Sequence, residues 1–171
     1  NPYLKVKKIF DYIDPFPWAS ALEYSTIANI PEYVLDHKKG DCGQQTLLFM
    51  TLCRCAGIPT HFQSGFMMHP GAVNLHDWCE IYVNGYGWIP VDQSFGKFTY
   101  AKNEAEKYFY LGGIDNYRMV VNQDYSGRLR KKRFPRSETV DFQRGEVEWK
   151  GGNLYFDKWS WNIEVEQYHN L

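Results

Sequence analysis

The chain has 171 residues, of which 44% are hydrophobic and 23% charged, and its formal net charge is −1. This composition is typical of a globular domain with a sizeable core, and no run approaches the roughly 18 consecutive apolar residues that a membrane-spanning helix requires. A net charge near zero also excludes a protein whose overall field attracts nucleic acid or anionic lipid.

The N-terminal part of the chain is expected to be helical. Prolines at positions 15, 17 and 31 divide it into short helices, and Lys38–Asp41 makes a polar turn. The strongest helical pattern follows over 42–56, where Leu48 and Leu52 belong to one apolar stripe. Gly57 stands where a C-terminal helix cap belongs, and a proline two residues later prevents continuation.

The pattern then changes to the period of two that is typical of strands. Strands are expected over 61–68, 76–83 and 88–92. The Asn84-Gly85 pair predicts a tight turn between the last two. These strands would form an antiparallel sheet packed against the helix over 42–56, with a further helix over 102–110.

Beyond Asp115, short strand-like runs alternate with turns rich in Gly, Asp and Asn. Strands are expected over 117–122, 139–142, 147–150 and 159–165. Because short hairpins bury too little apolar surface to fold alone, the prediction is a core over 1–115 and a β-rich extension over 116–171 that packs on it. Six Arg and Lys residues between positions 128 and 136 form either a solvated loop or a docking patch for an acidic partner.

Four cysteines are too few for a disulfide scaffold of this size, and their spacing matches no structural zinc site. No acidic cluster is shaped like a calcium loop. The sequence therefore predicts no metal dependence and no cofactor.

Cys42 is the candidate nucleophile. A cysteine attacks a carbonyl as the thiolate, so a catalytic cysteine needs a lowered pKa. Cys42 opens the predicted helix, where the positive end of the helix dipole favours an anion, and Gly43 allows close approach of a substrate to the backbone. Most free cysteines are small buried hydrophobes, and that role is expected for the others, Cys53, Cys55 and Cys79.

His76 and Asp92 are the expected partners of Cys42. The strand that begins at His76 is followed by a tight turn, which returns the next strand and brings Asp92 beside it. A carboxylate there fixes the imidazole tautomer and stabilises the imidazolium. Two rival histidines have less support: His61 lacks a downstream carboxylate in phase, and His69 lies in a loop.

Three motifs resemble those of transglutaminase-like domains. They are GDCG at 40–43 followed by an apolar helix and RCAGIP at 54–59, HDWCEIY at 76–82, and GWIPVD at 87–92. The family's nucleophile, histidine and aspartate segments have similar sequences in the same order. The resemblance covers Gly40 to Gly96, about a third of the chain.

The resemblance implies an α+β, papain-like fold with N-terminal helices, a nucleophile helix on an antiparallel sheet, and a β-rich C-terminal extension. It implies that Cys42, His76 and Asp92 form a triad that works through an acyl-enzyme. The Cys42 amide and an upstream donor would hold the oxyanion. Trp18, by analogy with an upstream tryptophan in related enzymes, and Gln44 are the candidates for that donor.

The same resemblance leaves several functions open. The favoured one is a cysteine hydrolase or acyltransferase on peptide or isopeptide amides, with a protein or peptide as partner and peptidase-like hydrolysis preferred. The alternatives are a catalytically silent scaffold that binds protein or glycan, and a peptide N-glycanase-like amidase. The oligomeric state stays open, and a bacterial, periplasmic or secreted location is expected, with the targeting segment absent because the chain begins Asn-Pro-Tyr.

Overall fold

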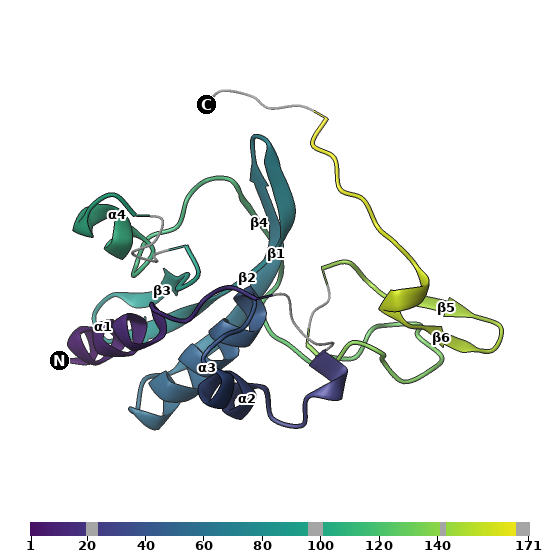
Figure 1. Ribbon diagram of the computed structural model, residues 1–171, viewed down its shortest axis with the longest axis horizontal. Helices are drawn as coiled ribbons and strands as arrows, with labels where there is room; N and C mark the ends of the chain where they lie inside the picture. The colour runs from purple at the N-terminus through teal and green to yellow at the C-terminus, as the bar shows by residue number, and fades with distance from the viewer. Residues whose placement is uncertain (20–23, 96–100, 141–142, 167–171) are drawn as a thin grey trace.

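A computed structural model describes residues 1–19, 24–95, 101–140 and 143–166. Helices from the N-terminal half pack against a central antiparallel sheet, and an extension with a small hairpin follows (Figure 1). The expected α+β fold is therefore confirmed. Across the described residues, no helix has the length and apolar character needed to cross a membrane.

The first two long helices begin where the sequence provides caps and prolines. Helix α1 (Pro2–Ile13) starts after Asn1, whose side chain accepts the Tyr3 amide hydrogen. Helix α2 (Ile30–His37) starts after an asparagine that caps it in the same way, and both helices carry a proline in the first turn. Proline thus marks helix starts here as well as interruptions.

Helix α3 (Cys42–Cys55) is the central helix, and its bounds match the expected 42–56 closely. Its residues from 43 to 50 are all buried, because α1, α2 and the sheet surround it. Gly57 follows with a φ of 80°, the left-handed conformation that favours glycine at a helix end. The helix is therefore held on several sides with its N-terminus fixed in place.

Four strands form the main sheet in the order β3-β2-β1-β4. They are β1 (Thr60–His69), β2 (Ala72–Val83), β3 (Gly87–Val91) and β4 (Arg118–Asn122). All neighbours are antiparallel, and the turn at Asn84-Gly85 joins β2 to β3 as expected. Strand β4 comes from the region assigned to the extension, so the extension contributes one edge of the sheet.

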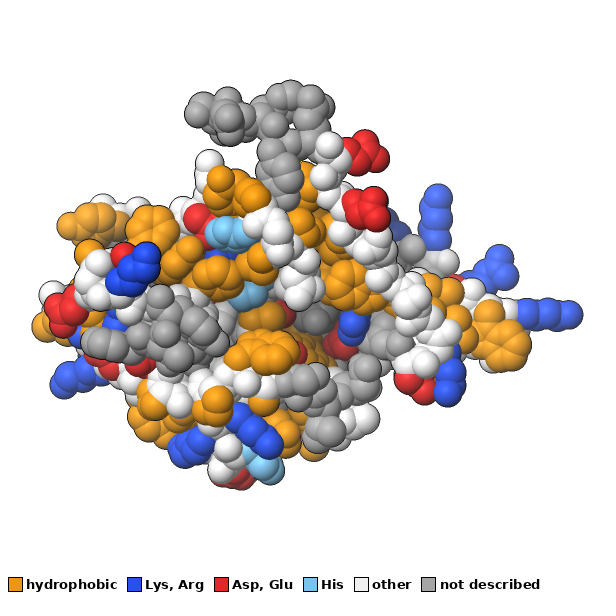
Figure 2. Space-filling view, turned by 45° about the horizontal axis from the view of Figure 1, so that its top comes forward, with side chains coloured by type: hydrophobic (Ala, Val, Ile, Leu, Met, Phe, Trp, Pro, Cys, Tyr) orange, Lys and Arg blue, Asp and Glu red, His pale blue; other side chains and the backbone are white. Residues whose placement is uncertain are grey.

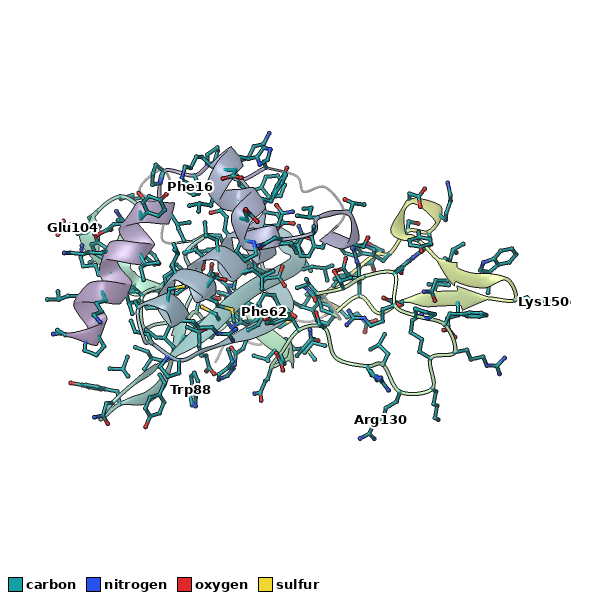
Figure 3. All side chains as sticks on the ribbon, turned by 90° about the horizontal axis from the view of Figure 1, so that it is seen from below. Phe16, Phe62, Trp88, Glu104, Arg130 and Lys150 are labelled. Atoms are coloured by element: carbon teal, nitrogen blue, oxygen red, sulfur yellow. The ribbon has the colours of Figure 1, made fainter. Side chains whose placement is uncertain are left out.

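The core fills the space between the helices and the sheet. Phe10 of α1 meets Phe49 of α3 edge to face, with ring centroids 6.5 Å apart. Phe62 is completely buried and lies in the middle of the molecule in Figure 3, whereas Arg130 projects from a loop of the extension and Lys150 lies at its far end. This core fixes α3 and β2 relative to each other, and these two elements carry Cys42 and His76.

The remaining elements are short. They are η1 (Tyr24–Thr26), α4 (Glu104–Phe109), β5 (Val147–Trp149), β6 (Gly152–Leu154) and η2 (Phe156–Lys158). Strands β5 and β6 pair as a hairpin. The predicted strand over 159–165 is wrong: these residues form no strand, and within the described part of the chain no strand lies beside them. Residues 141–142 of another predicted strand lie outside the described residues, and residues 139–140 form no strand.

The basic run belongs to the extension. Lys132 is paired with Glu146 at 2.8 Å and with Glu148 at 3.2 Å, and Arg136 lies 3.5 Å from Glu146. Other Lys and Arg side chains project from the extension's end, at the right of Figure 2. Part of the run therefore stabilises the extension itself, and the rest is solvated.

Candidate active site

Cys42 is the first residue of α3, and a bonded cap holds it there. Asp41 Oδ1 accepts the Gln44 amide hydrogen at 2.9 Å and the Tyr24 hydroxyl hydrogen at 2.5 Å. Burial raises the pKa of Asp41, against the effect of these hydrogen bonds. The thiol is half-buried and lies at the helix N-terminus, where the helix dipole favours a thiolate.

His76 and Asp92 are in direct contact. His76 Nε2 lies 2.7 Å from Asp92 Oδ2, and the two residues are 5% and 1% exposed. The pairing of β2 with β3 produces this contact, because Cys79 lies opposite Val91 and the chain then turns towards His76. With Nε2 donating to a carboxylate, Nδ1 is the ring nitrogen left to accept a proton.

Asp92 is surrounded by hydrogen-bond donors. Its Oδ2 also accepts from Arg118 Nη1 at 2.8 Å, and its Oδ1 accepts from the Ser94 hydroxyl at 2.7 Å, the Ser94 amide at 3.1 Å and the Phe95 amide at 3.3 Å. Burial alone would raise the pKa of Asp92, but the charge and hydrogen bond of His76 and the charge of Arg118 hold it well below its usual range. Asp92 is therefore a permanent anion near neutral pH.

Arg118 is a residue of this site that the sequence did not identify. It opens β4, its side chain is 3% exposed, and its Nε also donates to Asp115 Oδ2 at 2.9 Å. The guanidinium lies over the Phe95 ring, 4.4 Å from the centroid. The arginine thus links the sheet edge formed by the extension to Asp92.

Asp77 is a second residue that the sequence did not identify. The Cys42 thiol donates to Asp77 Oδ2 at 3.2 Å, and Gln143 Nε2 donates to Asp77 Oδ1 at 3.0 Å. Asp77 is 3% exposed, and burial followed by the nearby charge of Asp41 raises its pKa to about 6. The candidate nucleophile therefore has a carboxyl group as a hydrogen-bond partner.

Gly43 makes room for this arrangement. A Cβ at position 43 would lie 2.7 Å from Asp77 Oδ2 and closer still to the Tyr24 hydroxyl. Glycine to alanine in a helix ordinarily stabilises by about 0.5–1 kcal/mol. Here we expect Gly43→Ala to lower the free energy of unfolding by about 1–3 kcal/mol, because two buried polar groups must move. Urea unfolding measures the change, and a gain in stability would contradict the packing described.

The three weaker candidates differ in burial, and only Gly43 and Gln44 adjoin Cys42 in the sequence. Gln44 is completely buried, and its Oε1 lies next to Gly40 rather than in solvent. Gly43 is buried, and its amide donates to Asp41. The Trp18 backbone forms an isolated bridge with Gly40, and its side chain is 58% exposed.

The rival histidines have other carboxylate partners. His61 Nε2 lies 3.0 Å from Glu80 Oε2 on the adjacent strand, so the expectation that it lacks a carboxylate partner was wrong. His69 Nε2 lies 3.3 Å from Asp115 Oδ1. Within the described residues, no group of three or more His, Cys, Asp or Glu side chains could hold a metal ion.

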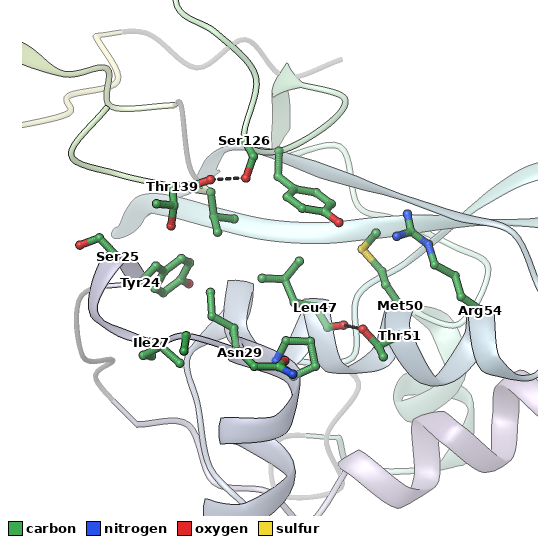
Figure 4. Close-up of a pocket in the computed structure, with 15 residues that line it drawn as sticks. Tyr24, Ser25, Ile27, Asn29, Leu47, Met50, Thr51, Arg54, Ser126 and Thr139 are labelled. Carbon is green, nitrogen blue, oxygen red and sulfur yellow. Dashed lines mark hydrogen bonds between the residues drawn. The ribbon is translucent and has the colours of Figure 1, made fainter. Parts of the chain in front are cut away.

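A separate cavity of about 430 Å³ lies between the N-terminal segment, α3 and the extension (Figure 4). Leu47, Met50 and Arg54 of α3 line one side, and Tyr125 and Val140 of the extension line another. Neither Cys42 nor the two residues expected to form a triad with it are among its lining residues. The cavity is therefore distinct from the candidate active site.

Comparison with known proteins gives a family. The chain matches none of the curated proteins. A candidate cysteine protease from Cytophaga hutchinsonii is 26% identical with a TM-score of 0.46, over 54% of this chain and 31% of that one. The periplasmic domain of TgpA from Pseudomonas aeruginosa is 22% identical with a TM-score of 0.47, over 56% of this chain and 37% of that one. The matched part is thus about a third of each of those structures.

The family model of the transglutaminase-like superfamily matches residues 1–93, which is more than half of the 171 residues. The match includes the N-terminal helices, where the sequence motifs gave no signal, and ends just after Asp92. This chain belongs to the transglutaminase-like superfamily.

Proposed function

We propose that the chain is a cysteine-nucleophile enzyme that cleaves or transfers peptide or isopeptide amide bonds, with hydrolysis as the favoured outcome. The observation that carries the proposal is the buried contact between His76 Nε2 and Asp92 Oδ2 at 2.7 Å. With Nε2 bonded to the carboxylate, Nδ1 is the nitrogen that would take the thiol proton in the proposed reaction. Cys42 supports it from the N-terminus of α3. Membership of the transglutaminase-like superfamily also supports it.

In the proposed reaction, His76 Nδ1 takes the thiol proton and the thiolate of Cys42 attacks the amide carbonyl carbon. The tetrahedral intermediate collapses as the C–N bond breaks, and His76 gives its proton to the departing amine. Water, activated by the same imidazole, then attacks the thioester and releases a carboxylic acid. A primary amine in place of water would give transamidation. Asp92 keeps the imidazole in the required tautomer throughout.

The oxyanion would be held by the Cys42 amide and one upstream donor. Trp18 is the favoured donor, because its backbone lies beside Gly40 and its side chain is exposed. Gln44 and Gly43 are less favoured for this role. The Gln44 side chain is buried beside Gly40, and the amides of both residues are used by Asp41.

The first test is alkylation of Cys42 by iodoacetamide against pH, read by mass spectrometry in a Cys55→Ser background. Cys53 and Cys79 are buried, and burial raises the pKa of the Cys53 thiol to about 12 and that of Cys79 well above its usual value, so both serve as internal references. We expect Cys42 to react readily below pH 7. His76→Ala should slow the alkylation of Cys42 by about 10–100-fold, because the thiol loses its proton acceptor and the thiolate loses its counter-ion.

His37→Ala is the matched control, since His37 is exposed and bonds only the Tyr33 carbonyl among the described contacts. It should leave the Cys42 rate unchanged. If Cys42 reacts no faster than an ordinary thiol with a pKa of about 8.5, or if His76→Ala leaves its rate unaltered, the enzymatic proposal fails. A binding scaffold would then be the better description.

Hydrolysis and transfer are separated with a peptide library and a fluorescent primary amine. Hydrolysis predicts new peptide termini without amine incorporation, whereas transfer predicts incorporation into glutamine-containing peptides. Both products must disappear in Cys42→Ala. A glycopeptide in the same assay tests the N-glycanase alternative. The periplasmic or secreted location stays a prediction.

A further inference from the structure

A buried carboxyl group that the proposed reaction does not use touches the nucleophile. Asp77 follows His76 on β2, and its Oδ2 accepts the Cys42 thiol hydrogen at 3.2 Å. The match to the superfamily model ends at residue 93, yet Gln143, far beyond it, donates to the other carboxyl oxygen at 3.0 Å. The extension therefore contacts the neighbourhood of the nucleophile directly.

The carboxyl group of Asp77 is enclosed from several elements. The absence of a side chain at Gly43 lets it lie against the first turn of α3, where a Cβ would come within 2.7 Å. The titratable groups that face it are Asp41 before α3, Cys42 on α3 and His76 on its own strand, and Gln143 faces it from the extension as a neutral donor. The Tyr24 hydroxyl, which also lies against Gly43, is bonded to Asp41.

The two protonation states of such a group act on a thiol in opposite ways. An ionised carboxylate accepts the thiol hydrogen and repels the thiolate at short range, so the thiolate is disfavoured. A protonated carboxyl group is neutral and donates a charge-assisted hydrogen bond to the thiolate. Because burial and Asp41 raise the pKa of Asp77 to about 6, both states are populated in the mildly acidic range.

We propose that Asp77 is a second acid–base partner of Cys42, which favours the reactive thiolate when protonated and holds the unreactive thiol when ionised. No covalent step is added: the proton on Asp77 exchanges with solvent, and the thiol proton still passes to His76. The inference rests on the proposed function in that it concerns the same nucleophile. It predicts an enzyme whose nucleophile is most available in mild acid.

Asp77→Asn tests the proposal, with the rate of Cys42 alkylation by iodoacetamide as the readout from pH 5 to pH 8. At pH 5 the parent carboxyl group is mostly protonated, so parent and variant should react at similar rates. At pH 7 the protonated fraction is about a tenth. The ratio of variant rate to parent rate should therefore rise from about 1 at pH 5 to as much as about tenfold at pH 7. A ratio that stays constant with pH overturns the proposal.

Gln143→Met is the second variant. It keeps the volume of the side chain but removes the donor, and this hydrogen bond lowers the pKa of Asp77 by favouring the ionised form. In Gln143→Met the pKa of Asp77 should therefore be higher, and the fall in Cys42 reactivity with rising pH should begin at a higher pH than in the parent. Glu80→Gln is the matched control, because Glu80 lies on the same strand but is paired with His61. The rate of Cys42 alkylation in Glu80→Gln, divided by the rate in the parent, should be about 1 at every pH.

Thermal melting provides a readout that does not depend on reactivity. The folded-state pKa of Asp77 lies above its ordinary value, so the folded protein loses stability as the pH rises from about 4 to about 6. Asp77→Asn should therefore raise Tm relative to the parent at pH 7 but not at pH 4. A variant that melts lower than the parent at both pH values would show that the carboxyl group is needed for packing instead.

The His76→Ala arm keeps the two proposals apart. If His76→Ala leaves the Cys42 rate unchanged while the Asp77→Asn ratio still rises with pH, the proposed function fails and the thiol–carboxyl coupling stands. If His76→Ala slows Cys42 and the Asp77→Asn ratio is flat, the coupling alone is wrong.

Discussion

Arg118→Met is expected to lower the free energy of unfolding by about 3–5 kcal/mol, the usual cost of removing one member of a buried ion pair. The guanidinium is 3% exposed and lies 2.8 Å from Asp92 and 2.9 Å from Asp115, so the substitution removes the arginine charge that the two carboxylates share. Methionine fills a comparable volume over the Phe95 ring. The loss should therefore reflect charge rather than a cavity, and urea unfolding at pH 7 measures it.

The pH dependence of this loss follows from Asp92. Its pKa lies below the unfolded value, so the stabilisation by the ionised form is present above about pH 4 and is lost as the pH falls towards the folded pKa. The charge of Arg118 is one of the effects that lower the pKa of Asp92, and the substitution removes it. The difference in the free energy of unfolding between the parent and Arg118→Met should be largest at pH 6–7 and should shrink below about pH 4.

Arg130→Met is the control, since Arg130 is exposed on a loop of the extension and its replacement should change stability by no more than about 0.5 kcal/mol. Arg118→Lys keeps a charge but cannot reach both carboxylates as a planar fork does. It should fall between the parent and Arg118→Met. Equal stability of all three variants would mean that the ion pair contributes nothing net.

The sequence was sufficient to predict the parts of the site that depend on local pattern. The helix at Cys42 follows from apolar spacing, a capping aspartate and a terminal glycine, and the hairpin that joins His76 to Asp92 follows from alternation and an Asn-Gly turn. Each of these signals acts over a few residues, and the capping aspartate and the helix-ending glycine also belong to the motifs that resemble the superfamily's. Local pattern and family resemblance therefore gave the same answer.

Arg118 and Asp77 depend on contacts that no local pattern encodes. Arg118 lies 26 residues after Asp92 and reaches it across the face of the sheet over Trp78, which requires knowing that β4 pairs with β1. Alternation along β2 assigns His76 and Asp77 to opposite faces. A prediction that reserves one face for the site consequently leaves Asp77 out.

The predicted strand over 159–165 shows the limit of alternation as a signal. Aromatic and β-branched residues alternate there with polar ones, yet a strand needs a partner to accept and donate its backbone hydrogen bonds. In the described structure no strand lies beside this segment. Residues 159–165 therefore have the alternation of a strand but, among the described residues, no neighbouring strand to pair with.

Asp92→Asn is expected to remove the His76-dependent part of Cys42 alkylation. In any peptide assay that Cys42→Ala abolishes, it should lower kcat/KM by about 10³–10⁴-fold. Among the described residues, every hydrogen bond to the Asp92 carboxylate is donated to it, by His76 and Arg118 on one oxygen and by Ser94 and Phe95 on the other. An amide has one acceptor oxygen, so its NH₂ group must face donors on one side or the other.

If the NH₂ group faces His76, Nε2 must become the acceptor and the proton moves to Nδ1, where it blocks transfer from the thiol. If it faces Ser94 and Phe95, the tautomer survives but the loop after β3 loses its bonds, and the imidazolium loses its counter-charge. Asp115→Asn is the matched control, because it also removes a carboxylate from Arg118 but leaves His76 untouched. We expect it to keep most of the Cys42 reactivity. Equal loss in the two variants would assign the effect to Arg118 rather than to the imidazole, and full reactivity of Asp92→Asn would remove Asp92 from the proposed mechanism.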